Sequence, residues 1–297
     1  MLGPLTPKRV LAIGESQSAI FLTTYVNSID PLAKVYDGFL IHSRFGGAPL
    51  PDAASIQNRQ SSALTGVKYR PDLRVPVMTL ISETDLIGSG LSGYWGARRP
   101  DDAKLRVWEM PGTAHADTYM LMAAATDSGV VPIEKLAALL KPTATTIVGR
   151  LAKPINAAPQ HHYVAQSALA HLDAWVRTGR APPSAQPMAT TTDAAGAPKL
   201  VLDANGNTKG GVRTPWVDTP TAKLSGLGNS GGAFGFLFGT TEVYDAATLK
   251  RLYPGGQADY LKQFDASLAK AVKAGFILPA DQAEIRALAA ASYPAAP

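Results

Sequence analysis

The sequence contains no cysteine among its 297 residues. Disulfide bonds, thiolate metal sites and a cysteine nucleophile are therefore excluded. It also lacks any apolar run of about 18 residues, the length that a membrane-spanning helix needs. With 46% hydrophobic residues, the chain has the composition of a globular protein with a sizeable core.

A large excess of charge is lacking as well. Lys and Arg number 28 against 23 Asp and Glu, and the net charge of +5 is spread thinly along the chain. The basic pairs are Lys8-Arg9, Arg98-Arg99 and Lys250-Arg251, and none lies in a stripe of basic and aromatic residues. We therefore expect no nucleic-acid partner and no membrane partner. The first residues lack the order of a signal peptide, which favours the cytoplasm only if Met1 is the natural start, so the localisation stays unassigned.

Short apolar runs alternate with helical patterns in the first 180 residues. Buried strands are expected at residues 9–13, 36–41, 75–81 and 104–110. Helices are expected at residues 17–29, 133–140 and 161–178, the last of which ends at Gly179. Strands that alternate with helices indicate the α/β class, with a mostly parallel sheet and flanking helices.

The character of the sequence changes near residue 180. Residues 181–241 are rich in Pro, Thr, Gly and Ala, whereas residues 245–253, 257–274 and 280–292 have helical patterns. The sequence therefore predicts an α/β core over residues 1–180. A C-terminal irregular and helical subdomain over residues 181–297 is expected to pack on this core.

Two serines lie in motifs typical of serine hydrolases. Ser16 lies in G-E-S-Q-S, one residue away from G-x-S-x-G, and Ser230 lies in L-G-N-S-G-G, which contains that motif in full. In α/β hydrolases the nucleophile occupies a sharp turn between a strand and a helix. Only Ser16 has a predicted strand before it and a helix after it, with Gly14 and Ser18 as small flanking residues. The alternative is a serine in a tight turn, with Ser18 capping the helix.

The expected partners of Ser16 follow later strands in the order of this fold, which is Ser, then acid, then His. Asp85 comes just after the third predicted strand, and His115 follows the fourth, in P-G-T-A-H-A-D. Because parallel strands end at one edge of a sheet, we expect these side chains to lie together. Glu83 is the second choice of acid, whereas Asp117 lies too close to His115 in the sequence. No histidine follows Ser230, so we expect only a glycine-rich loop there.

Other polar residues could line a pocket at this edge. Glu15 and Arg44, which lies in S-R-F-G-G, are candidates, although a turn residue and a solvated loop are the alternatives. His42 also ends a strand, but it precedes Asp85 and so breaks the chain order. His161 opens a predicted helix and could point toward the site, although a capping or surface role is favoured.

A metal site would require several histidines to converge with carboxylates. His162 and His171 lie nine residues apart, which does not place them on adjacent turns of one helix face. We therefore expect neither a metal ion nor another cofactor.

Several segments resemble one known family. G-E-S-Q-S-A, V-Y-D-G-F-L-I-H-S-R, S-E-T-D and G-T-A-H-A-D resemble a family of α/β-hydrolase-domain proteins, as do G-G-V-R-T-P-W-V-D, L-S-G-L-G-N-S-G and L-F-G-T-T in the second half. This resemblance implies an esterase-like serine hydrolase with Ser16, Asp85 and His115 in the triad positions. In this fold the N–H of the residue after the nucleophile, here Gln17, binds the oxyanion. The expected partner is a small-molecule ester.

The sequence departs from this fold at its start. The nucleophile normally follows the fifth strand, whereas Ser16 follows the first, so we expect the N-terminal strands to be lacking. Truncation is the favoured explanation, and strands from a partner chain or replacement by residues 181–241 are the alternatives. The first strand would then have an unpaired apolar edge, which favours a homodimer.

Two functions remain open at this point. The main prediction is a serine hydrolase that cleaves carboxylic esters through a Ser-His-Asp acyl-enzyme mechanism. The alternative is a catalytically weak or inert fragment, or a binding module, that retains the sequence of the family.

Overall fold

A computed structural model describes residues 4, 6–51, 63–127, 129–232 and 234–294 of the chain. Its centre is a sheet of four parallel strands, in the order β1-β2-β5-β6. The strands are β1 (Leu11–Glu15), β2 (Gly38–His42), β5 (Val77–Ser82) and β6 (Leu105–Met110). All four predicted strands are confirmed, although β1, β2 and β5 begin two residues later than expected and β6 one residue later. In β1 and β2 the ladder begins with the pair Leu11 and Gly38, so the first two residues of each predicted apolar run precede the paired segment.

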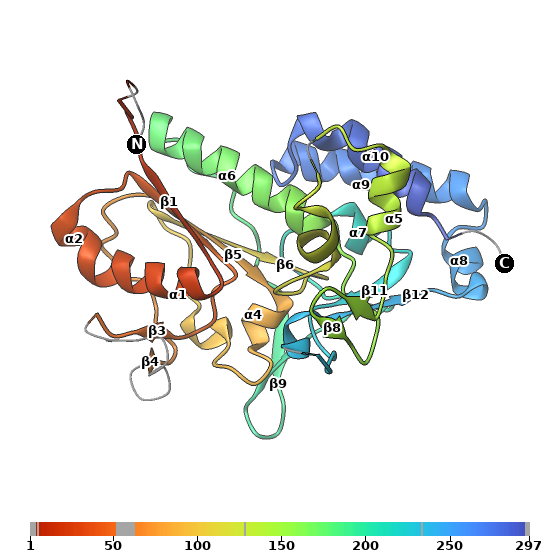
Figure 1. The fold of residues 1–297 in the computed structure, drawn as a ribbon, viewed down its shortest axis with the longest axis horizontal. Coiled ribbons are helices and arrows are strands. Elements are labelled where there is room, and N and C mark those ends of the chain that lie inside the picture. Colours follow the sequence, from red (N-terminus) through yellow and green to blue (C-terminus); the bar gives the residue numbers. More distant parts are fainter. Residues whose placement is uncertain (1–3, 5, 52–62, 128, 233, 295–297) are drawn as a thin grey trace.

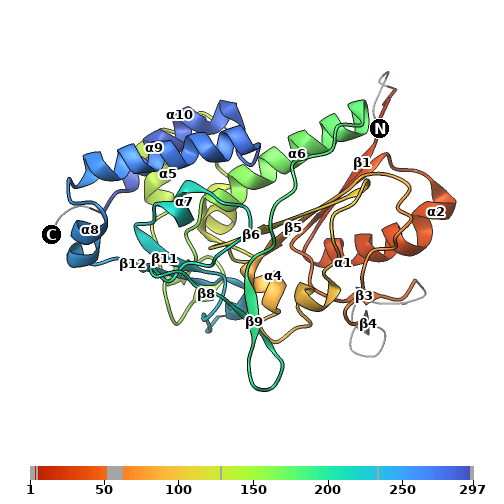
Figure 2. The ribbon, with the colours of Figure 1, turned by 180° about the vertical axis from the view of Figure 1, so that it is seen from behind.

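Helices cover both faces of the sheet, because the strand residues alternate between two apolar cores. Phe39 and Ile41 of β2 face α1 (Gln17–Thr24), whereas Leu40 faces α6 (Gln160–Thr178). Figure 1 shows α1 and α6 on opposite sides of the sheet, and the view from behind in Figure 2 agrees. The single helix predicted for residues 17–29 is instead α1 followed by a π-helical turn at Tyr25–Ile29 and by α2 (Asp30–Ala33).

One edge of the sheet is open at β1. Asp37 N–H bonds to the Val10 carbonyl and Ser16 N–H bonds to the His42 carbonyl, so the even-numbered residues of β1 face β2. The N–H and C=O groups of the odd-numbered residues therefore face away, and no strand pairs with them among the described residues. Ile13 on this edge is 56% exposed.

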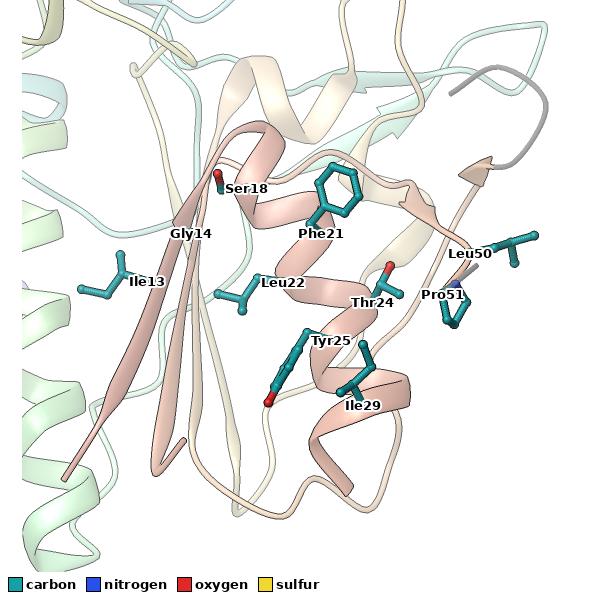
Figure 3. A pocket seen from close by; sticks show the side chains of 10 residues that line it. All are labelled: Ile13, Gly14, Ser18, Phe21, Leu22, Thr24, Tyr25, Ile29, Leu50 and Pro51. Carbon is teal, nitrogen blue, oxygen red and sulfur yellow. The ribbon is translucent and has the colours of Figure 1, made fainter. Parts of the chain in front are cut away.

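A pocket of about 400 Å³ lies beside the open edge of the sheet. Figure 3 shows Ile13 from β1, Phe21 and Leu22 from α1, and Leu50 and Pro51 from a following loop around this pocket. Its walls are largely apolar, and Ser18 contributes a polar group. The pocket therefore begins at Gly14 and Ser18, two residues on either side of Ser16, and extends along α1.

The C-terminal region consists of short antiparallel strand pairs followed by three helices. The pairs are β9 (Thr190–Thr192) with β10 (Pro198–Leu200), and β11 (Ala222–Ser225) with β12 (Thr240–Val243). The helices are α8 (Ala246–Leu252), α9 (Gln257–Ala274) and α10 (Gln282–Ser292), which confirms the helical patterns of the sequence. In Figure 1, α9 and α10 lie beside α5 (Ile133–Leu139) at the end of the molecule opposite to α2.

The core around α9 and α10 mixes residues from both parts of the chain. Leu136 of α5 and Tyr163 of α6 are buried in one cluster with Phe264 of α9 and Leu288 of α10. The division at residue 180 stays a prediction. The remaining elements are short: β3 (Ala48–Pro49), β4 (Ala63–Leu64), α4 (Glu83–Ile87), β7 (Thr145–Thr146), β8 (Gly149–Arg150), α7 (Pro215–Asp218), and helical turns at Tyr94–Ala97, Tyr119–Ala123, Gly235–Leu237 and Pro279–Asp281. No helix within the described ranges is both long and apolar enough to cross a membrane.

Candidate active site

Ser16 lies on the sharp turn between β1 and α1. Its φ of 55° and ψ of −117° are a strained combination for a residue with a side chain. Two backbone bonds hold the turn: Ser16 N–H donates to the His42 carbonyl (3.0 Å), and the Ser16 carbonyl accepts from Ile20 N–H (3.1 Å). A Cβ at Gly14 would lie 2.8 Å from the Ser18 carbonyl oxygen, so the turn requires glycine there.

The His115 imidazole lies between the hydroxyl of Ser16 and the carboxylate of Asp85. Its Nε2 is 2.8 Å from Ser16 Oγ, and its Nδ1 is 2.6 Å from Asp85 Oδ1. The three residues follow β1, β5 and β6, so their strands end at the same edge of the sheet. The structure thus brings together the three residues that the sequence singled out.

The Asp85 carboxylate is fixed by hydrogen bonds from Ser82 as well as by its contact with His115. It lies in the first turn of α4, where Ser82 Oγ (2.6 Å) and Ser82 N–H (3.0 Å) both donate to Asp85 Oδ2. Burial raises the pKa of the Asp85 carboxyl, but the adjacent His115 and the Ser82 hydrogen bonds outweigh burial and hold that pKa below its ordinary value. The Phe45 ring stacks on His115 with a centroid distance of 5.2 Å, which fixes the imidazole plane.

Glu83, the second choice of acid, does not contact His115. Its carboxylate instead accepts the N–H groups of Gly112 (2.6 Å) and Gly226 (2.8 Å). Burial raises the pKa of Glu83, and these backbone hydrogen bonds partly offset that effect. The α4 helix explains the difference, because its first turn directs Asp85 toward His115 and Glu83 into the protein interior.

Arg44, a candidate pocket residue from the sequence, lies among aromatic rings and backbone carbonyl groups. Its side chain is fully buried and lies over the rings of Tyr69 (4.9 Å) and Tyr94 (5.2 Å). The guanidinium also donates to the carbonyls of Phe45 (3.0 Å) and Val67 (2.7 Å). Aromatic faces and carbonyl oxygens can stabilise a cation away from water, so these contacts explain how the charge of Arg44 is accommodated in the interior.

Glu15 and Gln17 flank Ser16 in the turn. Glu15 is solvent-exposed at the end of β1. Partial desolvation of the carboxyl by the surrounding protein raises the pKa of Glu15, and the charges of His161 and His115 offset part of that rise. Gln17 is the first residue of α1, so its N–H belongs to the amides at a helix N-terminus that have no partner within the helix.

A second histidine pair lies next to these residues. The Nε2 atoms of His42 and His161 are 2.7 Å apart, and His161 Nδ1 is 3.4 Å from Asp117 Oδ2. Burial and the neighbouring His161 lower the pKa of His42 to about 3, although its ring keeps some accessible surface. Burial also acts against a charged His161, but Asp117 outweighs it and the pKa of His161 is raised. One of the two Nε2 atoms must therefore carry a proton and donate it to the other.

The sequence analysis missed this arrangement of His42, His161 and Asp117. The capping or surface role favoured for His161 is wrong, because its side chain is 4% exposed and faces the sheet edge. The signal in the sequence that could have revealed this arrangement is that His42 ends a strand at the same sheet edge as the turn at Ser16. His42 was excluded as the triad histidine because it precedes Asp85 in the chain. That chain order applies to triad residues and does not exclude a separate histidine pair.

Ser230 lies in an exposed loop, as expected. Its N–H bonds to Asn229 Oδ1 (2.9 Å) and its carbonyl accepts from Ala152 N–H (2.8 Å). No histidine of the described ranges hydrogen-bonds to it. Within those same ranges, no group of three or more His, Asp or Glu residues is placed to hold a metal ion.

The parallel sheet, the sharp strand-to-helix turn at Ser16 and the flanking helices are those of the α/β-hydrolase class. The family model described as "Alpha/beta hydrolase domain" matches residues 1–287. The chain belongs to this family, and membership suggests a hydrolase. Searches of curated proteins and of solved structures gave no significant match.

Proposed function

We propose that this protein is a serine hydrolase that cleaves carboxylic esters through a Ser16–His115–Asp85 triad. The observation that carries the proposal is the imidazole of His115, which hydrogen-bonds to both Ser16 Oγ (2.8 Å) and Asp85 Oδ1 (2.6 Å). A serine is activated as a nucleophile when a base lies within hydrogen-bonding reach and a third group orients that base. The strained turn at Ser16 presents the hydroxyl at the end of the sheet.

The first half of the reaction acylates Ser16. Its Oγ attacks the ester carbonyl carbon while Nε2 of His115 takes the hydroxyl proton. Asp85 holds the Nδ1 proton toward itself and stabilises the imidazolium that forms. The tetrahedral intermediate then collapses, the bond to the alcohol oxygen breaks, and His115 gives its proton to the departing alcohol.

The second half releases the acid. His115 takes a proton from water, and the resulting hydroxide attacks the acyl carbon of the Ser16 ester. Collapse of this second intermediate returns the proton from His115 to Ser16 Oγ. In both halves the N–H of Gln17 donates to the oxyanion, supported by the positive end of α1.

The rate depends on how many donors meet the oxyanion. Gln17 is the one donor that the described residues supply by their position, and loss of one oxyanion donor costs about 10²- to 10³-fold in rate. A slow hydrolase is therefore expected from this chain. The single oxyanion donor is also the observation that supports the second candidate function, a binding module without turnover.

Labelling with a fluorophosphonate separates the two functions. We expect the probe to label the wild type and Ser230→Ala but not Ser16→Ala, because Ser16, unlike Ser230, has the His115 imidazole at 2.8 Å among the described residues. Short-chain p-nitrophenyl esters should be hydrolysed with the same dependence on Ser16. Absence of labelling in the folded wild type would favour the binding module, and hydrolysis that survives Ser16→Ala would refute the assignment of the nucleophile.

A further inference from the structure

The carboxylate of Glu83 is buried without a cationic partner. Its side chain is 1% exposed, and no ion pair involves it among the described residues. A buried carboxylate is unfavourable unless hydrogen bonds replace its water shell. The two oxygens of Glu83 instead each accept a backbone N–H, from Gly112 (2.6 Å) and from Gly226 (2.8 Å). These N–H groups belong to segments more than a hundred residues apart.

The side chain of Asn156 joins the same two segments through their carbonyl groups. Its Nδ2 donates to the carbonyl of Gly112 (2.9 Å) and to the carbonyl of Ser225 (3.0 Å). Asn156 is fully buried, and its Oδ1 accepts the N–H of Ala158 (3.0 Å). Glu83 and Asn156 therefore satisfy the donors and the acceptors of the same pair of loops.

The third member of this network is Thr84. Its Oγ1 donates to the Gly226 carbonyl (2.5 Å) and accepts the backbone N–H of His115 (3.1 Å). The N–H of Glu83 also donates to the carbonyl of Thr113 (3.1 Å). Three residues of the His115 loop are thus bonded to the start of α4, and the side chains of Glu83, Thr84 and Asn156 connect the loop to the turn at Ser225–Gly226.

We propose that Glu83, Thr84 and Asn156 are positioning residues that hold the His115 loop against the turn at Ser225–Gly226. The inference rests on the proposed function, because it concerns the distance from His115 to Ser16. Residues 111–115 follow β6 and belong to no helix or strand, so these side chains supply the hydrogen bonds that a ladder would otherwise supply. The C-terminal part of the chain thereby supports the active site through the His115 loop.

The substitution Glu83→Gln tests this network with little change of volume. A Gln side chain presents an NH₂ group to one of the two backbone N–H groups, so one glycine loses its acceptor. We expect kcat to fall by about 10- to 100-fold, as for a shift of about 1 Å at a catalytic group, with KM within about twofold of the wild type.

Glu109 provides a matched control. Its carboxylate is also buried, pairs with Arg98 (2.6 Å) and accepts the N–H of Met188 (2.7 Å), but it does not contact the His115 loop. Glu109→Gln should lower the melting temperature and leave kcat within about twofold of the wild type at a temperature where the variant is folded. An equal loss of kcat in both variants would overturn the positioning role.

A spectroscopic measurement separates this inference from the proposed function. The Nδ1 proton of His115, in its short bond to Asp85, should give a downfield ¹H NMR resonance. We expect this resonance in the wild type and in Glu109→Gln, and its shift or loss in Glu83→Gln, whether or not any ester is hydrolysed. An inactive wild type would refute the proposed function alone, whereas an unchanged resonance and kcat in Glu83→Gln would refute the positioning role alone.

If Glu83→Gln does not fold, Thr84 supplies a second test. Thr84→Val removes the hydroxyl at constant shape and should shift the His115 resonance, because the bonds to Gly226 and to His115 N–H are both lost. Thr84→Ser keeps the hydroxyl and should restore the resonance. The same spectrum for Val and Ser would contradict the proposal.

Discussion

At Gly226 the C-terminal part of the chain packs tightly against the His115 loop. A Cβ added there would lie 2.4 Å from the Thr113 carbonyl oxygen, 2.6 Å from Glu83 Cβ and 2.8 Å from Thr84 N. Two of these three atoms belong to the backbone, so they cannot move aside by a change of rotamer. Gly226→Ala must therefore push the turn and the His115 loop apart.

The size of the effect follows from these distances. Non-bonded carbon atoms normally stay about 3.5 Å or more apart, so the loops must separate by about 1 Å. Overpacking of this kind costs about 1–3 kcal/mol of the free energy of unfolding. A displacement of about 1 Å at His115 should lower kcat by about 100-fold.

Gly96→Ala is a suitable control for this substitution. The nearest atom to its added Cβ is 3.9 Å away, and its backbone does not lie in the left-handed region. This variant should therefore be as stable as the wild type or slightly more stable, by about 0.4–1 kcal/mol. Thermal unfolding gives the stability, and the rate of fluorophosphonate labelling gives the reactivity of Ser16. A Gly226→Ala variant with wild-type labelling and melting temperature would show that this contact does not matter.

Three further predictions concern other parts of the molecule. Asp85→Asn should lower kcat by about 10⁴-fold in ester hydrolysis, because the amide favours the wrong tautomer of His115, and a loss below tenfold would contradict its role. His161 has a raised pKa, so its pairing with Asp117 stabilises the fold below about pH 6.5 and is lost as the pH rises through the folded-state pKa. The melting temperature of His161→Gln should thus differ most from the wild type near pH 6, and a difference that grows toward pH 9 would refute the pairing. The edge of β1 that no described strand pairs with can pair with the same edge of a second copy, so sedimentation should detect a dimer that Ile13→Lys abolishes, and a monomer at all concentrations would refute this.

The order of elements around the site could be predicted from the sequence because local patterns determine it. Four apolar runs marked the four strands, and G-E-S-Q-S marked a turn that only small residues permit. Asp85 and His115 could be chosen because they directly follow strands, and parallel strands end at a common edge. Each of these inferences uses residues within a few positions of one another.

The structure decided what depends on contacts between distant segments. Glu83 and Asp85 have the same charge and lie two residues apart, and only the direction of α4 assigns one to His115 and the other to Gly112 and Gly226. The burial of Arg44 between two tyrosine rings likewise depends on loops that the sequence does not relate. No local pattern carries this information, because the hydrogen-bond partners come from other parts of the chain.

The sequence by itself thus determined the α/β class, the strands and the candidate nucleophile, acid and base. Periodicity and turn chemistry act over a few residues, so the linear order of residues is sufficient for them. Only the tertiary structure decided that His161 pairs with His42, and that the turn at Ser225–Gly226 supports the His115 loop. These features depend on which distant N–H, C=O and imidazole groups meet when the sheet, α6 and the C-terminal strands pack together.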